Sequence, residues 1–214
     1  MLSGCASQQA SQGEELPSGA LNRTALRASR PRSIALAKTR SVVFDGSIGG
    51  SMTPGGALNG AIAGAIGAEP PGDYTATLLE YRIQDPVIAI RRSIVARMAR
   101  RFGLSVVSEE EAGGEVGAPV ATDLALAIDT QVWGIIPTRA RHYGIRYRGS
   151  LQLTDNRTHR VIAEGTCIAR PVDGDDSPTM DELRANEGAL LKASLAATAE
   201  YCIDDYRKRV LGLY

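Results

Sequence analysis

The feature that most constrains the fold is a strict alternation of residue types from Tyr143 to Thr154. A side-chain period of two is typical of a β-strand with one face in the core and the other in solvent. A turn at residues 155–158 then leads into a second run over 161–169, so the sequence predicts an antiparallel hairpin. The core face of the first strand would carry Tyr143, Ile145, Tyr147, Gly149, Leu151 and Leu153.

A first amphipathic helix is predicted directly after Asp85 and Pro86. Aspartate is typical of an N-cap and proline of the first helical position. Apolar residues then recur at helical spacing from Val87 to Phe102, where a following glycine ends the segment. Its other residues include five arginines, which suit either a solvated face or a contact with acidic groups, and Arg91 and Arg101 fall close to the apolar stripe.

A second, longer helix is predicted near the C-terminus. Thr179 and Glu182 have the spacing of a capping box, in which each side chain satisfies a backbone N–H of the first turn. The helical segment is expected to extend to about Leu211, with a division at Gly188. Its apolar side would pack on the sheet.

The order of these elements predicts the fold class. Further strands are expected at 33–45, 104–107 and 123–136, the last with a bulge near Asp129. Together they predict an α+β domain of two layers, in which a mostly antiparallel sheet of four to five strands is covered on one face by two helices. Residues 33–214 are expected to form this single domain, which is long enough to bury a core of its own.

Charge and hydropathy exclude some classes of partner. The chain of 214 residues has 24 basic and 24 acidic side chains, so the net charge offers no attraction to nucleic acid. It contains no continuous apolar run of the length that a membrane-spanning helix needs.

The first residues, Leu2-Ser3-Gly4-Cys5, resemble the lipobox of bacterial envelope lipoproteins. The resemblance implies that residues 1–4 are the remnant of a signal peptide and that Cys5 becomes a lipidated N-terminus. Neither Ala6 nor Ser7 is the aspartate that usually retains lipoproteins at the inner membrane, which implies a lipid anchor on the periplasmic side of the outer membrane. Residues 5–32 are poor in large apolar groups and predict a flexible tether.

The other two cysteines, Cys167 and Cys202, form an even pair. In the oxidising periplasm that the resemblance implies, they are expected to form a disulfide. The alternative is a pair of free buried thiols, as in a cytosolic protein.

A glycine-rich insertion at 46–73 interrupts the predicted domain. Gly56, Gly60 and Gly64 are four residues apart and Gly67 follows, so a helix here would present a glycine stripe of the kind that allows close packing in membranes. The apolar part is too short to cross a bilayer alone. A loop, or a short helix that needs a partner, is favoured over membrane insertion.

No catalytic, metal or cofactor site is predicted. His142 and His159 flank a long predicted strand and are expected to lie far apart, and no nucleotide, hydrolase or zinc motif is present. The acidic residues at 109–111 and 173–176 lack the spacing of a calcium loop. The chain is therefore not expected to be an enzyme.

These observations predict where in the cell the protein acts, and they predict no chemical reaction. The predicted outline is similar to envelope lipoproteins that assist outer-membrane assembly or serve ABC-type transport, and the similarity implies a non-catalytic role beside another envelope protein. The sheet or the insertion at 46–73 would contact that partner. Two alternatives stay open: a lipid- or small-ligand-binding module with its pocket between sheet and helices, and a protein that inserts its glycine stripe into a membrane.

Overall fold

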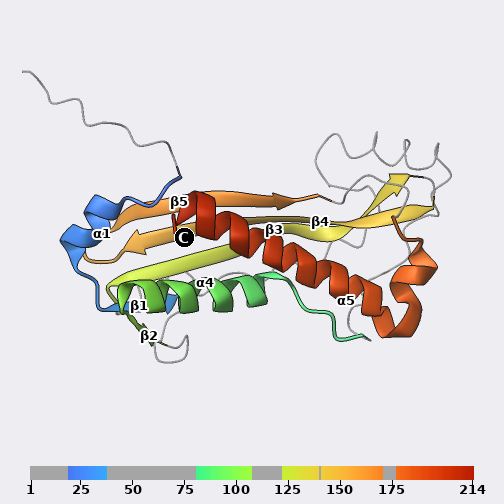
Figure 1. Cartoon of the computed structure of the whole chain (residues 1–214), viewed down its shortest axis with the longest axis horizontal. Coiled ribbons are helices and arrows are strands. Elements are labelled where there is room, and N and C mark those ends of the chain that lie inside the picture. The colour runs from blue at the N-terminus through green and yellow to red at the C-terminus, as the bar shows by residue number, and fades with distance from the viewer. Residues whose placement is uncertain (1–18, 38–80, 108–121, 140, 171–176) are drawn as a thin grey trace, which may run out of the picture.

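The computed structural model describes residues 19–37, 81–107, 122–139, 141–170 and 177–214. Their strands form one five-stranded sheet in the order β2-β1-β3-β4-β5. Helices pack on this sheet, so the predicted α+β fold is confirmed (Figure 1). The glycine-rich insertion at 46–73 lies outside the described residues.

Three long strands make the antiparallel part of the sheet. They are β3 (Leu124–Arg139), β4 (His142–Asp155) and β5 (Arg160–Ala169). The predicted hairpin of β4 and β5 is confirmed, with Leu153 opposite Ala163 and Gly149 opposite Cys167. A register shift between Thr130 and Val132 in β3 is close to the bulge expected near Asp129.

Two short strands extend the sheet in parallel. β1 (Ser33–Leu36) pairs with β3 on one side and with β2 (Ser105–Val107) on the other. The sheet is therefore mixed, although most of its paired residues belong to the antiparallel strands. Parallel neighbours need a crossover, and α4 supplies part of the one between β1 and β2.

Helices α4 (Val87–Phe102) and α5 (Met180–Asp205) cover one face of the sheet (Figure 1). The Asp85 carboxylate accepts a hydrogen bond from the Val87 N–H at 2.8 Å, so it caps α4 as predicted. The capping box of α5 is present, and non-helical backbone angles over residues 185–188 confirm its division at Gly188. A π-helical turn, η1 (Tyr206–Val210), continues from α5.

The core lies between these helices and the face of the sheet that the alternation predicted. Tyr147, Leu151 and Leu153 of β4 are buried, as are Ile94 and Met98 of α4. Apolar burial of this kind stabilises a fold by about 1.5–3 kcal/mol for each large side chain, so the alternating face of β4 contributes much of the stability.

The predicted tether at 5–32 is wrong for its last part. Residues 23–29 form a helix, α1 (Arg23–Ser29), and Leu26 is buried in the core together with Leu21. The backbone N–H groups of Leu21 and Asn22 also donate hydrogen bonds to Val210 and Ile162, each at 2.7 Å. Two leucines and these hydrogen bonds are enough to fold a segment whose average composition is polar.

Gly165→Ala should lower the free energy of unfolding by about 1–3 kcal/mol, as overpacking in a core does. The new Cβ would lie 2.4 Å from Cγ2 of Val210, so β5 and η1 would have to move apart. Urea denaturation measures the change. In a Val210→Ala background the same substitution should cost less, and an equal cost in both backgrounds would contradict the close contact.

Candidate functional site

The structure brings two of the predicted site residues together. Cys167 of β5 and Cys202 of α5 are bonded, with a Cα–Cα distance of 5.6 Å, and both side chains are buried. The predicted disulfide is confirmed and the alternative of two free thiols is wrong. The predicted lipidation site Cys5 and the glycines of the insertion, Gly56, Gly60, Gly64 and Gly67, lie outside the described residues.

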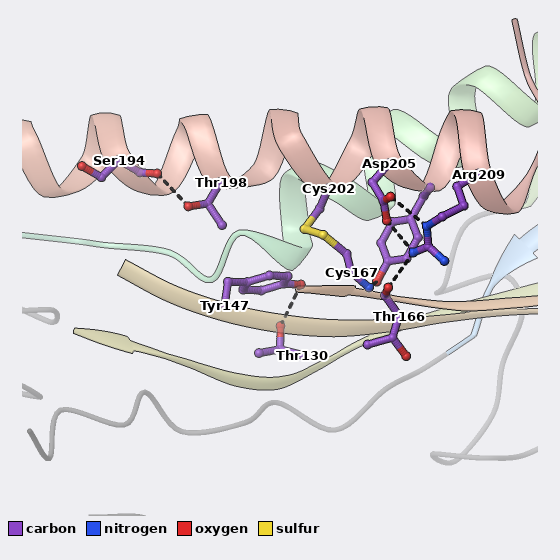
Figure 2. The surroundings of a disulfide bond; sticks show 10 residues. Thr130, Tyr147, Thr166, Cys167, Ser194, Thr198, Cys202, Asp205 and Arg209 are labelled. Atoms are coloured by element: carbon purple, nitrogen blue, oxygen red, sulfur yellow. Dashed lines mark hydrogen bonds and ion pairs between the residues drawn. A yellow bond between two sulfur atoms is a disulfide. The ribbon is translucent and has the colours of Figure 1, made fainter. Parts of the chain in front are cut away.

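The disulfide joins the edge strand of the sheet to the last turns of α5 (Figure 2). Gly149 lies opposite Cys167 in the neighbouring strand, and a Cβ there would lie 2.6 Å from the Tyr147 hydroxyl oxygen. The hydroxyl of Tyr206 accepts a hydrogen bond from the Cys167 N–H at 3.3 Å. This hydrogen bond connects η1 to the Cys167 backbone beside the disulfide.

Three polar side chains form a chain of contacts in the core beside the disulfide. The Thr130 hydroxyl lies 3.4 Å from the Tyr147 hydroxyl and donates to the Asp85 carboxylate at 2.8 Å. Burial raises the pKa of Asp85 above its ordinary value of 3.8, and the hydrogen bonds from Val87 and Thr130 offset only part of that rise in pKa.

The two buried tyrosines of this region, Tyr147 and Tyr206, are neutral hydrogen-bond donors and acceptors. Burial also raises the pKa of the Tyr147 and Tyr206 phenols, so both stay protonated at physiological pH. Because these hydroxyl groups are buried and hydrogen-bonded, they hold the core together and offer no reactive group to a substrate.

A polar hollow, here called the sheet hollow, lies on the side of the sheet opposite the core. Its volume is about 570 Å³. Side chains that face each other across β3, β4 and β5 line it: Asp129, Ser150, Gln152, Glu164 and Thr166.

Arg209 of η1 closes one side of the sheet hollow. Its guanidinium donates to the Thr166 carbonyl at 2.7 Å and to the Asp205 carboxylate at 2.7 Å. The hollow therefore presents hydrogen-bonding groups of both charges at an edge of the sheet.

A second hollow, here called the arginine pocket, lies between α1, the end of α4 and the C-terminal segment. Its volume is about 310 Å³. Four arginines line it, Arg23, Arg27, Arg30 and Arg101, together with apolar side chains of Leu26, Phe102 and Leu213. Guanidinium groups beside apolar surface can bind an anion that carries an apolar part.

The arginine pocket could not be predicted from the sequence because the composition of residues 5–32 is that of a tether. One signal was present: the Asn22 side chain caps α1 by accepting from the Ala25 N–H at 2.9 Å, and asparagine is a preferred N-cap. The short helix then places Leu26 in the core and leaves Arg27 and Arg30 exposed.

The two histidines lie where the sequence predicted, at opposite ends of β4. His142 begins the strand, and His159 lies in the turn after it. Among the described residues no three histidine, cysteine or acidic side chains are grouped as metal ligands would be. Within the same residues no helix has the length and apolar character needed to cross a membrane.

No protein-family model and no curated protein sequence matches the chain. Among solved structures, the protein XCC0632 from Xanthomonas campestris, described as DUF330, is 15% identical, with 82% of this chain and 83% of that chain covered and a TM-score of 0.40. A PelC dodecamer from Paraburkholderia phytofirmans is 13% identical, with 85% and 87% covered and a TM-score of 0.30.

Lipoprotein GNA1162 from Neisseria meningitidis is 12% identical, with 79% of this chain and 99% of that chain covered and a TM-score of 0.34. All three TM-scores are below 0.5. These likenesses therefore assign neither a family nor a function to the chain, and its function has to be inferred from its own residues.

Replacing both Cys167 and Cys202 by alanine should lower the free energy of unfolding by about 3–4 kcal/mol, because the bond closes a long loop in the unfolded chain. The sequence separation is 35 residues. Urea denaturation measures the change. A reducing agent should destabilise the wild-type protein by a similar amount and leave the double variant unaffected, and a reductant effect on the variant would contradict this account.

Asp85→Asn should change how stability depends on pH. A carboxyl whose pKa rises on folding stabilises the folded state below its ordinary pKa of 3.8, and this contribution is lost as the pH rises through the raised value. The free energy of unfolding of the wild type minus that of the variant should therefore fall as the pH is raised from below 3.8 to neutrality.

Urea denaturation of both proteins at each pH measures this difference. Asparagine keeps an oxygen that can accept from Val87 and Thr130, so the variant retains the cap. Hydrogen bonds lower the pKa of Asp123 and Asp204, but both proteins share these groups and their contribution cancels. A difference that does not change with pH would show that the pKa of Asp85 is not raised.

Proposed function

We propose that this chain is a lipid-anchored lipoprotein of the bacterial envelope, attached through Cys5 to the periplasmic side of the outer membrane. The observation that carries the proposal is the buried Cys167–Cys202 disulfide. Structural disulfides persist in oxidising compartments such as the periplasm and are rare in the cytosol. The lipobox resemblance of residues 2–5 leads to the same compartment by an independent route.

We further propose that the protein is a non-catalytic component of a transport or assembly complex. Polar groups in its core contact one another, as Asp85, Thr130 and Tyr147 do. Such a core supports a rigid scaffold for contacts with another protein rather than chemistry on a substrate.

The face of the sheet opposite the helices is the surface that we propose for the partner. Its exposed side chains include Arg146, Arg148 and Gln152 of β4, and the sheet hollow lies on the same face. Rigid strands hold these groups in fixed positions, which lowers the entropy lost when a partner binds.

Binding of a small polar ligand in the sheet hollow is the second candidate function. The observation that favours it is the hollow's volume of about 570 Å³ with acid, amide, hydroxyl and guanidinium groups along its walls. This site differs from the pocket between sheet and helices that belonged to the ligand-binding alternative, because core side chains pack between the sheet and the helices. Insertion of the glycine stripe into a membrane stays an open alternative.

A photo-reactive residue at Gln152 should form a covalent adduct with another envelope protein in cells of the native host. Gln152 is exposed on the partner face, whereas the control position, Lys192, is exposed on α5. Gel shift and mass spectrometry identify adducts, and the mass of the N-terminal peptide reports lipid at Cys5. The adduct should form at Gln152 and be absent at Lys192.

The Cys5→Ser variant supplies the second control in this experiment. Compared with the wild type, it should be less abundant in the membrane fraction and form less adduct, because the anchor would hold the protein beside its partner. Wild-type protein with an unmodified Cys5 thiol would contradict the lipid anchor. Equal adducts at Gln152 and Lys192, or none at either position, would contradict the proposed partner face.

A further inference from the structure

The arginine pocket is built from segments that are distant in the sequence. Arg27 and Arg30 belong to α1 and its C-cap, Arg101 to the last turn of α4, and Arg23 is tied to the C-terminal segment by a hydrogen bond to the Gly212 carbonyl at 2.6 Å. Figure 1 shows α1 and the end of α4 at the same end of the molecule. The fold therefore gathers guanidinium groups that no local sequence pattern places together.

The charge of this pocket is not balanced by its own walls. Among the described residues that line it, none is acidic. The acidic groups at the end of α5 are occupied: Asp204 pairs with Arg207 and Lys208, and Asp205 pairs with Arg209. Arginine stays protonated at all physiological pH values, so the pocket keeps its positive charge.

The apolar part of the pocket indicates what kind of anion fits. Phe102 supplies most of this apolar surface: it is half-buried, and the Arg101 guanidinium carbon lies 5.7 Å from its ring centroid. Leu26 and Leu213, with exposed fractions of only 4% and 6%, add little to it. A small, fully hydrated anion gains little from such a surface. A phosphate group carried on an apolar chain matches both the guanidinium groups and the apolar walls.

We propose that the arginine pocket binds the phosphate head group of an anionic phospholipid at the membrane surface. The planar guanidinium group of arginine matches phosphate with two parallel hydrogen bonds, which favours phosphate over a simple point contact. Tyr214, whose exposed fraction is 92%, follows the pocket residue Leu213, and tyrosine is enriched at the level of lipid head groups.

The pocket lies where the chain enters the fold from the proposed lipid anchor at Cys5. This part of the inference rests on the proposed function. Gly19, the first described residue, leads through Leu21 and Asn22 into α1, so the chain enters the fold beside the pocket. The 14 peptide units that join Cys5 to Gly19 can span at most about 50 Å. A lipid at Cys5 would keep the pocket within that distance of the bilayer.

Vesicle cosedimentation of the full chain tests the proposal. The protein carries Cys5→Ser, so no lipid anchor contributes, and keeps its disulfide. Vesicles of phosphatidylcholine are compared with vesicles that also contain phosphatidylglycerol. The chain should bind the second kind more tightly. Combined Arg27→Gln, Arg30→Gln and Arg101→Gln substitutions should weaken that binding about 100-fold, because each arginine near an anionic surface contributes about fivefold.

A matched control removes the same charge elsewhere. Arg146→Gln, Arg148→Gln and Arg170→Gln alter three exposed arginines, two in β4 and one directly after β5. This control should bind phosphatidylglycerol vesicles within a few-fold of the unsubstituted chain. Circular dichroism and the thermal unfolding midpoint should be unchanged in both triple variants, since all six side chains are exposed.

Equal binding to both kinds of vesicle, or equal binding by the pocket variant and the unsubstituted chain, would overturn the proposal. So would equal losses in both triple variants, or tighter binding of the pocket to polyglutamate than to the vesicles. Free glycerol phosphate should displace the chain from the vesicles only at concentrations far above that of the lipid. Displacement at a concentration equal to that of the lipid would mean that the pocket binds a soluble phosphate instead. Because this chain has no Cys5 thiol, these results are independent of the lipid-anchor test.

Discussion

The packing of β5 against α5 and η1 is the constraint on which the rest of the structure depends. β5 is an edge strand, and an unprotected edge is open to pairing with other chains. Here the Cys167–Cys202 bond fixes the edge strand to α5, and Gly165 lets Val210 approach the strand closely. The C-terminal turn that follows is thereby held along the same edge.

That edge also determines where the N-terminal segment lies. Backbone hydrogen bonds from Leu21 to Val210 and from Asn22 to Ile162 attach the segment to η1 and to β5. α1 then lies beside the end of α4, and the arginine pocket forms between them. The proposed membrane-facing end and the proposed partner face of the sheet are thus distinct surfaces, so one protein could contact a bilayer and another protein together.

Much of the fold could be predicted because its signals are local. The alternation of β4, the cap of α4 by Asp85 and the capping box of Thr179 and Glu182 each involve neighbouring residues, and each is present in the structure. The parallel pairing of β1 with β3 and β2 had no such signal, because β1 is short and its partners are distant in the sequence. The two hollows could not be predicted, since each is lined by residues from several elements.

The sequence by itself determined which residues of β4 and α4 enter the core and which two cysteines could pair, because side-chain period and cysteine count are properties of the chain. Only the tertiary structure decided that Leu21 and Leu26 belong to the folded body and that Arg27, Arg30 and Arg101 meet in one pocket. The physical reason is that burial and charge clustering depend on distances in space. A short polar segment folds when an existing edge strand offers hydrogen bonds and a core offers room for two leucines.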